Sequence, residues 1–188
     1  PEATYEERER IAKRHEDYTK GLLYFVGHDE RIPEHIRKEM LSWGYPKDEY
    51  VNNNHWSPQL YVREARRMVS DVVMTQHHCQ GKEVVSDGIA YAAYSMDSHN
   101  CDRVVIDGCV RNEGDVQIKN IIPYPISYRS IVPKRSEITN LFVPFCLSAS
   151  HIAFGSIRME PVFMVLSQVS ATAASMAIDN NCKVQDVD

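Results

Sequence analysis

The sequence predicts an α+β chain, with helices first, strands in the middle and a strand, a turn and a helix at the end. Three observations support this fold class. The first segment is charged and has apolar residues at near-helical spacing, the middle alternates polar and apolar residues, and an apolar run near the C-terminus leads into a helix with few charges. We therefore expect a helical region over residues 1–58, a mostly antiparallel β-rich region over 59–139 and a strand–turn–helix over 140–188.

The N-terminal region contains two predicted helices. The first runs from Thr4 to about Val26, with Thr4 as its cap and acidic residues in its first turn. The second is short, starts at Pro33 and ends before Gly44, because proline suits a helix start and glycine a helix end.

The middle region contains the predicted strands. The segments QLYVREARRMVSDVV and DGIAYAAYSMDSH each fit one strand. DRVVIDGCVRNEGDVQIKNIIP fits two strands around a turn at residues 112–115, and PYPISYRSIVP is an extended segment bounded by prolines.

The last third predicts a strand over NLFVPFCL, a turn over SASHIAFGSIR and a helix from about Glu160 to Ile178. The helix has so few charges that we expect it to be buried nearly all round. Small residues recur on one of its faces, which favours close packing. These are Ser167, Ser170, Ala171, Ala174 and Ala177. Free N–H groups at the helix start would favour an anion, although a serine-capped turn without any ligand explains the same residues.

Composition excludes several classes of protein. The 188 residues carry a net charge of -5, which argues against a nucleic-acid binder. No apolar run approaches the roughly 18 residues that cross a bilayer, so we expect no transmembrane segment. The cysteine count is odd and without CxxC pairs, which favours buried thiols, and the adjacent His77, His78 and Cys79 would diverge on an extended chain, so we expect no metal site.

Five segments, in order, resemble the C-terminal part of a family of FAD-dependent oxidoreductases, some of whose members carry a xanthan-lyase label. They are YVREARRMV, YSMDSHN, RNEGD, PYPISYRSIVPK and the stretch from NLFVPFCL to SMAID, so the resemblance covers roughly Gln59 to the C-terminus.

The resemblance implies an FAD site. The β-rich region would be a substrate domain, and the strand, turn and final helix would complete a Rossmann-like FAD domain. The turn residues would then lie along the ribityl chain and flavin ring. These predicted cofactor-binding residues are Ser148, Ala149, Ser150, His151, Gly155, Ser156, Ile157 and Arg158.

One departure from the family pattern affects this expectation, because GxGxxG, which holds the FAD pyrophosphate, is absent from the sequence. We therefore expect the C-terminal fragment of a longer flavoprotein, inactive by itself and without bound FAD. Its partner would be an upstream Rossmann half of the same protein. The exposed flavin-facing surface would be apolar, so the fragment should also self-associate.

Four residues are candidates for catalysis. Asp97 and His99 would share one face of a strand, where a carboxylate can orient an imidazole for general acid–base work; a plain surface pair is the alternative. Tyr128 and Arg129 could bind an acidic or carbonyl group of a small organic or sugar-like substrate, or Arg129 could form a structural salt bridge, for example with Glu64.

Three functions follow. The leading hypothesis is an oxidoreductase whose parent protein passes a hydride between an organic substrate and FAD. A polysaccharide lyase of the xanthan type is the second, with His99, Tyr128 and Arg129 as base and carboxylate-neutralising groups. A non-catalytic binding module is the third.

Overall fold

The structure, a computed structural model, describes residues 2–62, 64 and 66–188. The chain forms two compact units, Pro1–Arg63 and Glu64–Asp188. Helices and small antiparallel sheets together confirm the predicted α+β class.

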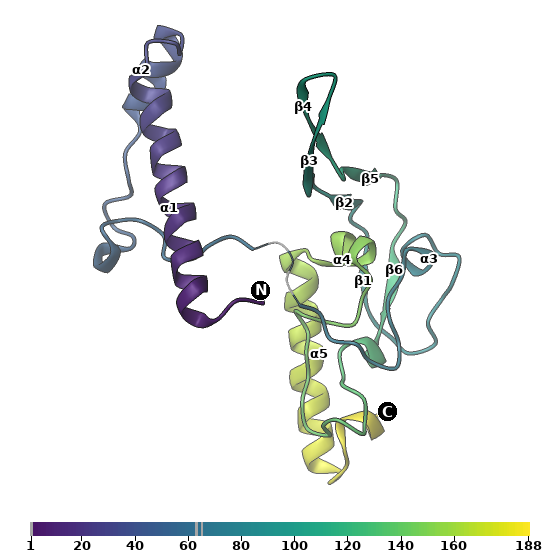
Figure 1. Cartoon of the computed structure of the whole chain (residues 1–188). Helices are drawn as coiled ribbons and strands as arrows, with labels where there is room; N and C mark the ends of the chain where they lie inside the picture. Colours follow the sequence, from purple (N-terminus) through teal and green to yellow (C-terminus); the bar gives the residue numbers. More distant parts are fainter. Residues whose placement is uncertain (1, 63, 65) are drawn as a thin grey trace. The chain divides into compact units, whose positions relative to one another are not determined.

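The first unit consists of helices and loops. Its elements are α1 (Tyr5–His28), α2 (Glu34–Ser42) and the 3₁₀ turn η1 (Val51–Asn53) (Figure 1). The Thr4 hydroxyl accepts a hydrogen bond from the backbone N–H of Glu7, which confirms the predicted N-cap of α1. Gly27 is buried where α1 meets α2, and a Cβ there would lie 3.1 Å from Leu41. The local signals therefore located both helices.

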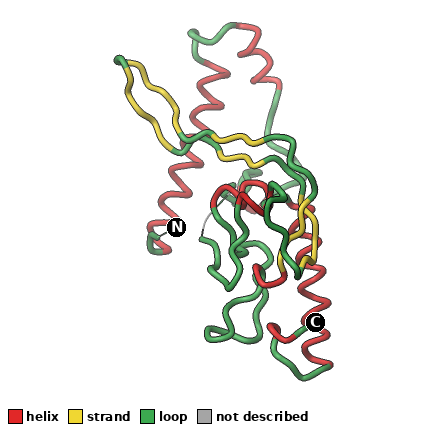
Figure 2. The backbone as a smooth tube through the Cα atoms, turned by 90° about the vertical axis from the view of Figure 1, so that its right-hand side faces the viewer, coloured by secondary structure: helices red, strands yellow, loops and turns green. Residues whose placement is uncertain are grey.

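The second unit holds the remaining elements. Its helical segments are α3 (Gln76–Cys79), η2 (Tyr128–Ser130), α4 (His151–Ile157), α5 (Glu160–Asp179) and η3 (Val184–Asp186). Its strands are β1 (Gly88–Ala92), β2 (Met96–Ser98), β3 (Asp102–Ile106), β4 (Cys109–Glu113), β5 (Val116–Ile118) and β6 (Tyr124–Ser127). Among the described residues they form three antiparallel pairs, β1–β6, β2–β5 and β3–β4. Figure 2 shows the β3–β4 hairpin projecting from the rest of the unit.

The hairpin turn lies at Asp107 and Gly108, which have φ values of 51° and 73°. Positive φ at both central residues is typical of the tight turns that join antiparallel strands. The turn expected at residues 112–115 was wrong, because its first half pairs with β3 and Gly114, with φ 96°, separates β4 from β5.

Two predicted strands are irregular segments. In NLFVPFCL and in the described part of QLYVREARRMVSDVV, which omits positions 63 and 65, no strand forms. The segments still make an isolated hydrogen bond to each other, from Met68 N to Cys146 O at 2.8 Å. Directly after both segments, Met74 N donates to Ser148 O at 2.9 Å. Pro144 interrupts NLFVPFCL and cannot donate to a ladder.

The core of the second unit contains buried residues of α3, β1, β2, β6, α4 and α5. Its largest fully buried side chains are apolar. They include Met74, Met96, Tyr124, Ile126, Ile131, Leu147, Ile157 and Leu166. Of the cysteines, Cys79 is in this core, whereas Cys101, Cys109 and Cys146 are exposed, so the expectation of buried thiols was wrong for these three.

Helix α5 is less buried than its composition predicted. It buries Leu166, Ala173 and Ala177, while Met164 and Ile178 are 72% and 78% exposed. The elements with the most contacts to α5 are β1 and η3, and these contacts leave Met164 and Ile178 uncovered. Helix α5 has 20 residues, and a window of 18 of them has a mean hydropathy of 1.5, so α5 is also long and apolar enough to cross a membrane, contrary to the expectation from apolar runs. One such helix is weak evidence of a span, because core helices of soluble proteins have the same length and composition.

Candidate functional site

The predicted turn after residue 147 is largely a helix, α4, so that expectation was wrong. Ser150 is its N-cap, and its hydroxyl accepts a hydrogen bond from Ala153 N at 3.4 Å. The residues from 153 to 157 are all buried. Serine at the cap and an apolar face toward the core explain why this short segment becomes helical.

Gly155 brings α4 against strand β2. A Cβ at this position would lie 2.6 Å from the carbonyl oxygen of Asp97, closer than any ordinary side chain could approach. The sequence indicated that something approaches the backbone of this segment closely. The group that does so at Gly155 is the backbone of β2.

Two of the serines predicted to bind the cofactor form hydrogen bonds within the chain. The buried Ser148 hydroxyl accepts from Ser70 N at 3.0 Å. The buried Ser156 hydroxyl accepts from Tyr124 at 2.8 Å and donates to the carbonyl of Tyr94 at 2.5 Å. Both hydroxyls therefore take part in hydrogen bonds between segments of the second unit.

Most of the remaining residues predicted to bind the cofactor are buried or in contact with other residues of the chain. Ala149 and Ile157 are buried, Arg158 contacts Asp97, and Ser150 caps α4, while His151 is exposed. The buried members of this set therefore make their contacts within the chain itself. Flavin contact by this segment stays a prediction for the parent protein.

The structure brings Asp97 and His99 together, as their spacing predicted. His99 Nε2 lies 3.3 Å from Asp97 Oδ2, and Arg158 Nη2 lies 3.3 Å from the same oxygen. Asp97 Oδ1 is buried and has no hydrogen-bond partner among the described residues. Asp97 and His99 line a pocket of about 210 Å³ together with Gln117 and Lys119. The pair can therefore exchange a proton with a small polar molecule.

A second hydrogen-bonded group lies on the other side of β2. Ser98 Oγ is 2.7 Å from His151 Nε2, and His151 Nδ1 is 2.5 Å from Glu64 Oε2. The other carboxylate oxygen of Glu64 pairs with Arg67, whose Nε donates to Ala149 O at 2.8 Å. Sequence reasoning missed this group because its members are 53 and 87 residues apart.

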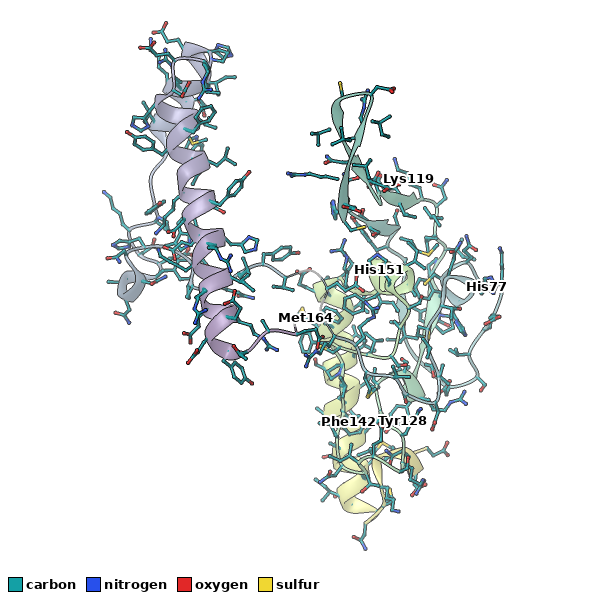
Figure 3. The ribbon with its side chains drawn as sticks, viewed as in Figure 1. His77, Lys119, Tyr128, Phe142, His151 and Met164 are labelled. Carbon is teal, nitrogen blue, oxygen red and sulfur yellow. The ribbon has the colours of Figure 1, made fainter. Side chains whose placement is uncertain are left out.

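Tyr128 and Arg129 lie elsewhere in the unit. In Figure 3 Tyr128 is beside Phe142 and well separated from His151 on α4. The Tyr128 hydroxyl donates to Val184 O at 2.7 Å, and burial raises the pKa of Tyr128 to about 12. Tyr128 also lines a cavity of about 550 Å³ beside α5.

Arg129 forms its ion pair with Asp87, not with Glu64. Arg129 Nε lies 2.9 Å from Asp87 Oδ2, which also accepts from Ser127 Oγ at 2.7 Å. Burial disfavours the charged carboxylate, but the hydrogen bonds from Arg129 and Ser127 outweigh burial and lower the pKa of Asp87 to about 2. This ion pair ties η2 to the segment before β1.

The adjacent histidines also have structural partners. His78 Nδ1 accepts from Thr75 N at 3.0 Å in a capping box at the start of α3, and His77 lies 3.4 Å from Glu83. Within residues 2–62, 64 and 66–188, no group of three or more potential metal ligands forms.

Comparison with known proteins extends the resemblance seen in the sequence. The family model described as FAD dependent oxidoreductase matches residues 1–188, so it includes the N-terminal helical unit as well as the part after Gln59. No curated protein and no solved structure matches. The chain belongs to the FAD-dependent oxidoreductase family.

Proposed function

We propose that the parent protein transfers a hydride between an organic substrate and FAD, and that this chain supplies the proton-transfer pair. The observation that carries the proposal is the Asp97 carboxylate, which lies 3.3 Å from both His99 Nε2 and Arg158 Nη2. Family membership supports the oxidoreductase class.

The two residues have different parts in this chemistry. Oxidation of an alcohol or amine by hydride loss also requires that a proton leave the substrate. His99 faces Asp97 with Nε2, so its Nδ1 is available to take that proton. The Asp97 carboxylate orients the ring and stabilises the imidazolium, and Arg158 keeps the carboxylate in place.

The pocket beside this pair suits a small polar substrate. Its volume is about 210 Å³, and Tyr94, Ser95, Gln117 and Lys119 supply hydroxyl, amide and ammonium groups. A sugar-like or other hydroxylated molecule of a few heavy atoms matches these donors and acceptors.

We further propose that an upstream Rossmann half of the same protein holds FAD, and that this chain is the C-terminal fragment. The absence of GxGxxG from the sequence supports the first point. The uncovered apolar side of α5, which includes Met164 and Ile178, is a surface against which that half would pack. Without it, the chain should bind no flavin and show no redox activity.

Expression of the parent open reading frame tests the proposal. We expect a yellow protein with flavin absorbance that substrate bleaches, and a loss of roughly 100-fold in kcat for His99→Gln. His35→Gln, at an exposed position on α2, is the matched control. A folded parent that takes up no FAD would refute the proposal, and release of unsaturated uronate without FAD would favour a polysaccharide lyase.

The predicted catalytic roles of Tyr128 and Arg129 have a separate test in the parent. Both side chains already have partners within the chain, Val184 and Asp87. If they bind substrate, Tyr128→Phe and Arg129→Lys should raise KM at unchanged stability. If they are structural, the same variants should lower stability and leave KM unchanged.

A further inference from the structure

The group on the α4 side of β2 has the atoms of an activated nucleophile. Ser98 Oγ lies 2.7 Å from His151 Nε2, and His151 Nδ1 lies 2.5 Å from Glu64 Oε2. We propose that Ser98, His151 and Glu64 form a serine–histidine–carboxylate relay, in which Ser98 attacks carboxylic esters. This activity is independent of FAD and of the proposed oxidation.

The order of the contacts determines the direction of proton transfer. A carboxylate only accepts hydrogen bonds, so the ring proton of His151 must lie on Nδ1, toward Glu64. Nε2 is then the acceptor for the hydroxyl proton of Ser98. This is the tautomer that a histidine needs to activate a serine, and the carboxylate stabilises the imidazolium that results.

The carboxylate is itself held in place. Arg67 pairs with the other oxygen of Glu64 and donates its Nε–H to Ala149 O at 2.8 Å. Arg67 also lies over the ring of Phe154, with its guanidinium carbon 5.6 Å from the ring centre. A fixed acid keeps the imidazole in one orientation, as the relay requires.

The backbone positions both ends of the serine–histidine contact. Ser98 pairs with Val116 of β5, so its strand is held by a neighbour. His151 and Gly155 are four residues apart and lie on one face of α4, where Gly155 meets the backbone of Asp97. The missing side chain at Gly155 thus lets α4 come close enough for His151 to reach Ser98.

Access is from the side of the histidine. Ser98 is 7% exposed, whereas the side chain of His151 is 59% exposed. An ester can therefore approach along the open edge of the imidazole and present its carbonyl carbon to Ser98.

The reaction balances without any further reagent. Ser98 Oγ bonds to the carbonyl carbon as its proton moves to His151 Nε2. The ester C–O bond then breaks, and the alcohol leaves with that proton. Water, deprotonated by His151 in the same way, cleaves the Ser98 ester to give the carboxylic acid and restores the hydroxyl.

A fluorophosphonate probe tests the relay in the intact chain without flavin. We expect one adduct, on Ser98 by peptide mass spectrometry, and a labelling rate that falls about 100-fold in His151→Gln and about 10-fold in Glu64→Gln. Ser98→Ala should abolish the adduct, and Ser86→Ala, at an exposed position, should leave it unchanged.

Three results would overturn the proposal. They are no adduct on folded wild-type chain, equal labelling of several serines, or an unchanged rate at Ser98 in His151→Gln. Circular dichroism of each variant separates loss of the nucleophile from loss of the fold. Since the labelling needs no FAD, a negative result leaves the proposed oxidation unaffected, and failure of flavin binding in the parent leaves this relay unaffected.

Discussion

Arg158 Nη2 lies 3.3 Å from both the carbonyl oxygen and the carboxylate Oδ2 of Asp97, and so joins the end of α4 to strand β2. The two side chains are only 10% and 17% exposed, so water does little to screen the pair. This contact connects the predicted catalytic pair to the predicted cofactor segment.

Removal of this guanidinium should destabilise the second unit. In Arg158→Ala the Asp97 carboxylate loses its buried partner, and we expect the free energy of unfolding to fall by about 2–3 kcal/mol. Urea unfolding followed by circular dichroism measures the change. Lys82→Ala removes a positive charge at an exposed position and should have little effect. An unaltered midpoint for Arg158→Ala would show that the contact contributes nothing.

Alanine at Gly155 should separate α4 from β2. Its Cβ would lie 2.6 Å from Asp97 O and 3.3 Å from Asp97 N, and these backbone atoms cannot rotate away. We expect the free energy of unfolding to fall by about 1–3 kcal/mol and amide hydrogen exchange to become faster in peptides from β2 and α4.

The matched control for that variant is Gly21→Ala. Nothing lies within 4 Å of a Cβ at Gly21 in α1, so alanine should stabilise the helix by about 0.5–1 kcal/mol. Both tryptophans, Trp43 and Trp56, are in the first unit, so their fluorescence reports that unit separately. Slow exchange in α4 of Gly155→Ala would contradict the packing described here.

Acid should weaken the second unit through Asp87. Its pKa is about 2 in the folded chain, below the ordinary 3.8, so its contribution is complete above about pH 4 and is lost as the pH falls toward 2. We expect the free energy of unfolding to fall by about 1–2 kcal/mol between pH 4 and pH 2. Thermal unfolding at a series of pH values measures it.

Substitution of Asp87 identifies the source of that acid slope. Asp87→Asn should have a lower free energy of unfolding at neutral pH, and this free energy should change less between pH 4 and 2 than in the wild type. Asp48→Asn, in the first unit, should retain the wild-type pH dependence. A wild-type slope in Asp87→Asn would assign the acid sensitivity to other carboxylates.

The uncovered side of α5 should make the chain self-associate. Met164 and Ile178 are 72% and 78% exposed on an apolar helix, and we expect the sedimentation coefficient to rise with concentration. Met164→Lys and Ile178→Lys should each shift the chain toward monomer. Val105→Lys, at a residue 72% exposed on β3, is the control, and a monomer at all concentrations would refute the expectation.

Local signals were sufficient for the helices and for one contact of the site. Capping by Thr4, the proline at the start of α2 and the low charge of α5 act within a few residues, and they located these helices. Asp97 and His99 are two residues apart, so strand geometry alone predicted that they would meet.

Errors in the sequence prediction arose where distant segments compete for the same backbone. Asp107 and Gly108 carry a strong turn signal, yet only the pairing of β3 with β4 shows which of the neighbouring turns joins the strands. NLFVPFCL is apolar enough for a strand, but its backbone hydrogen bonds are isolated and do not form a continuous ladder with a neighbouring segment.

By itself the sequence determined the α+β class, the helices α1, α2 and α5 and the Asp97–His99 pair, because these depend on residues that are close in the chain. The tertiary structure decided that α4 is a helix closed onto β2 and that Ser98, His151 and Glu64 meet. Such contacts depend on the packing of segments 53 and 87 residues apart, which no local pattern records.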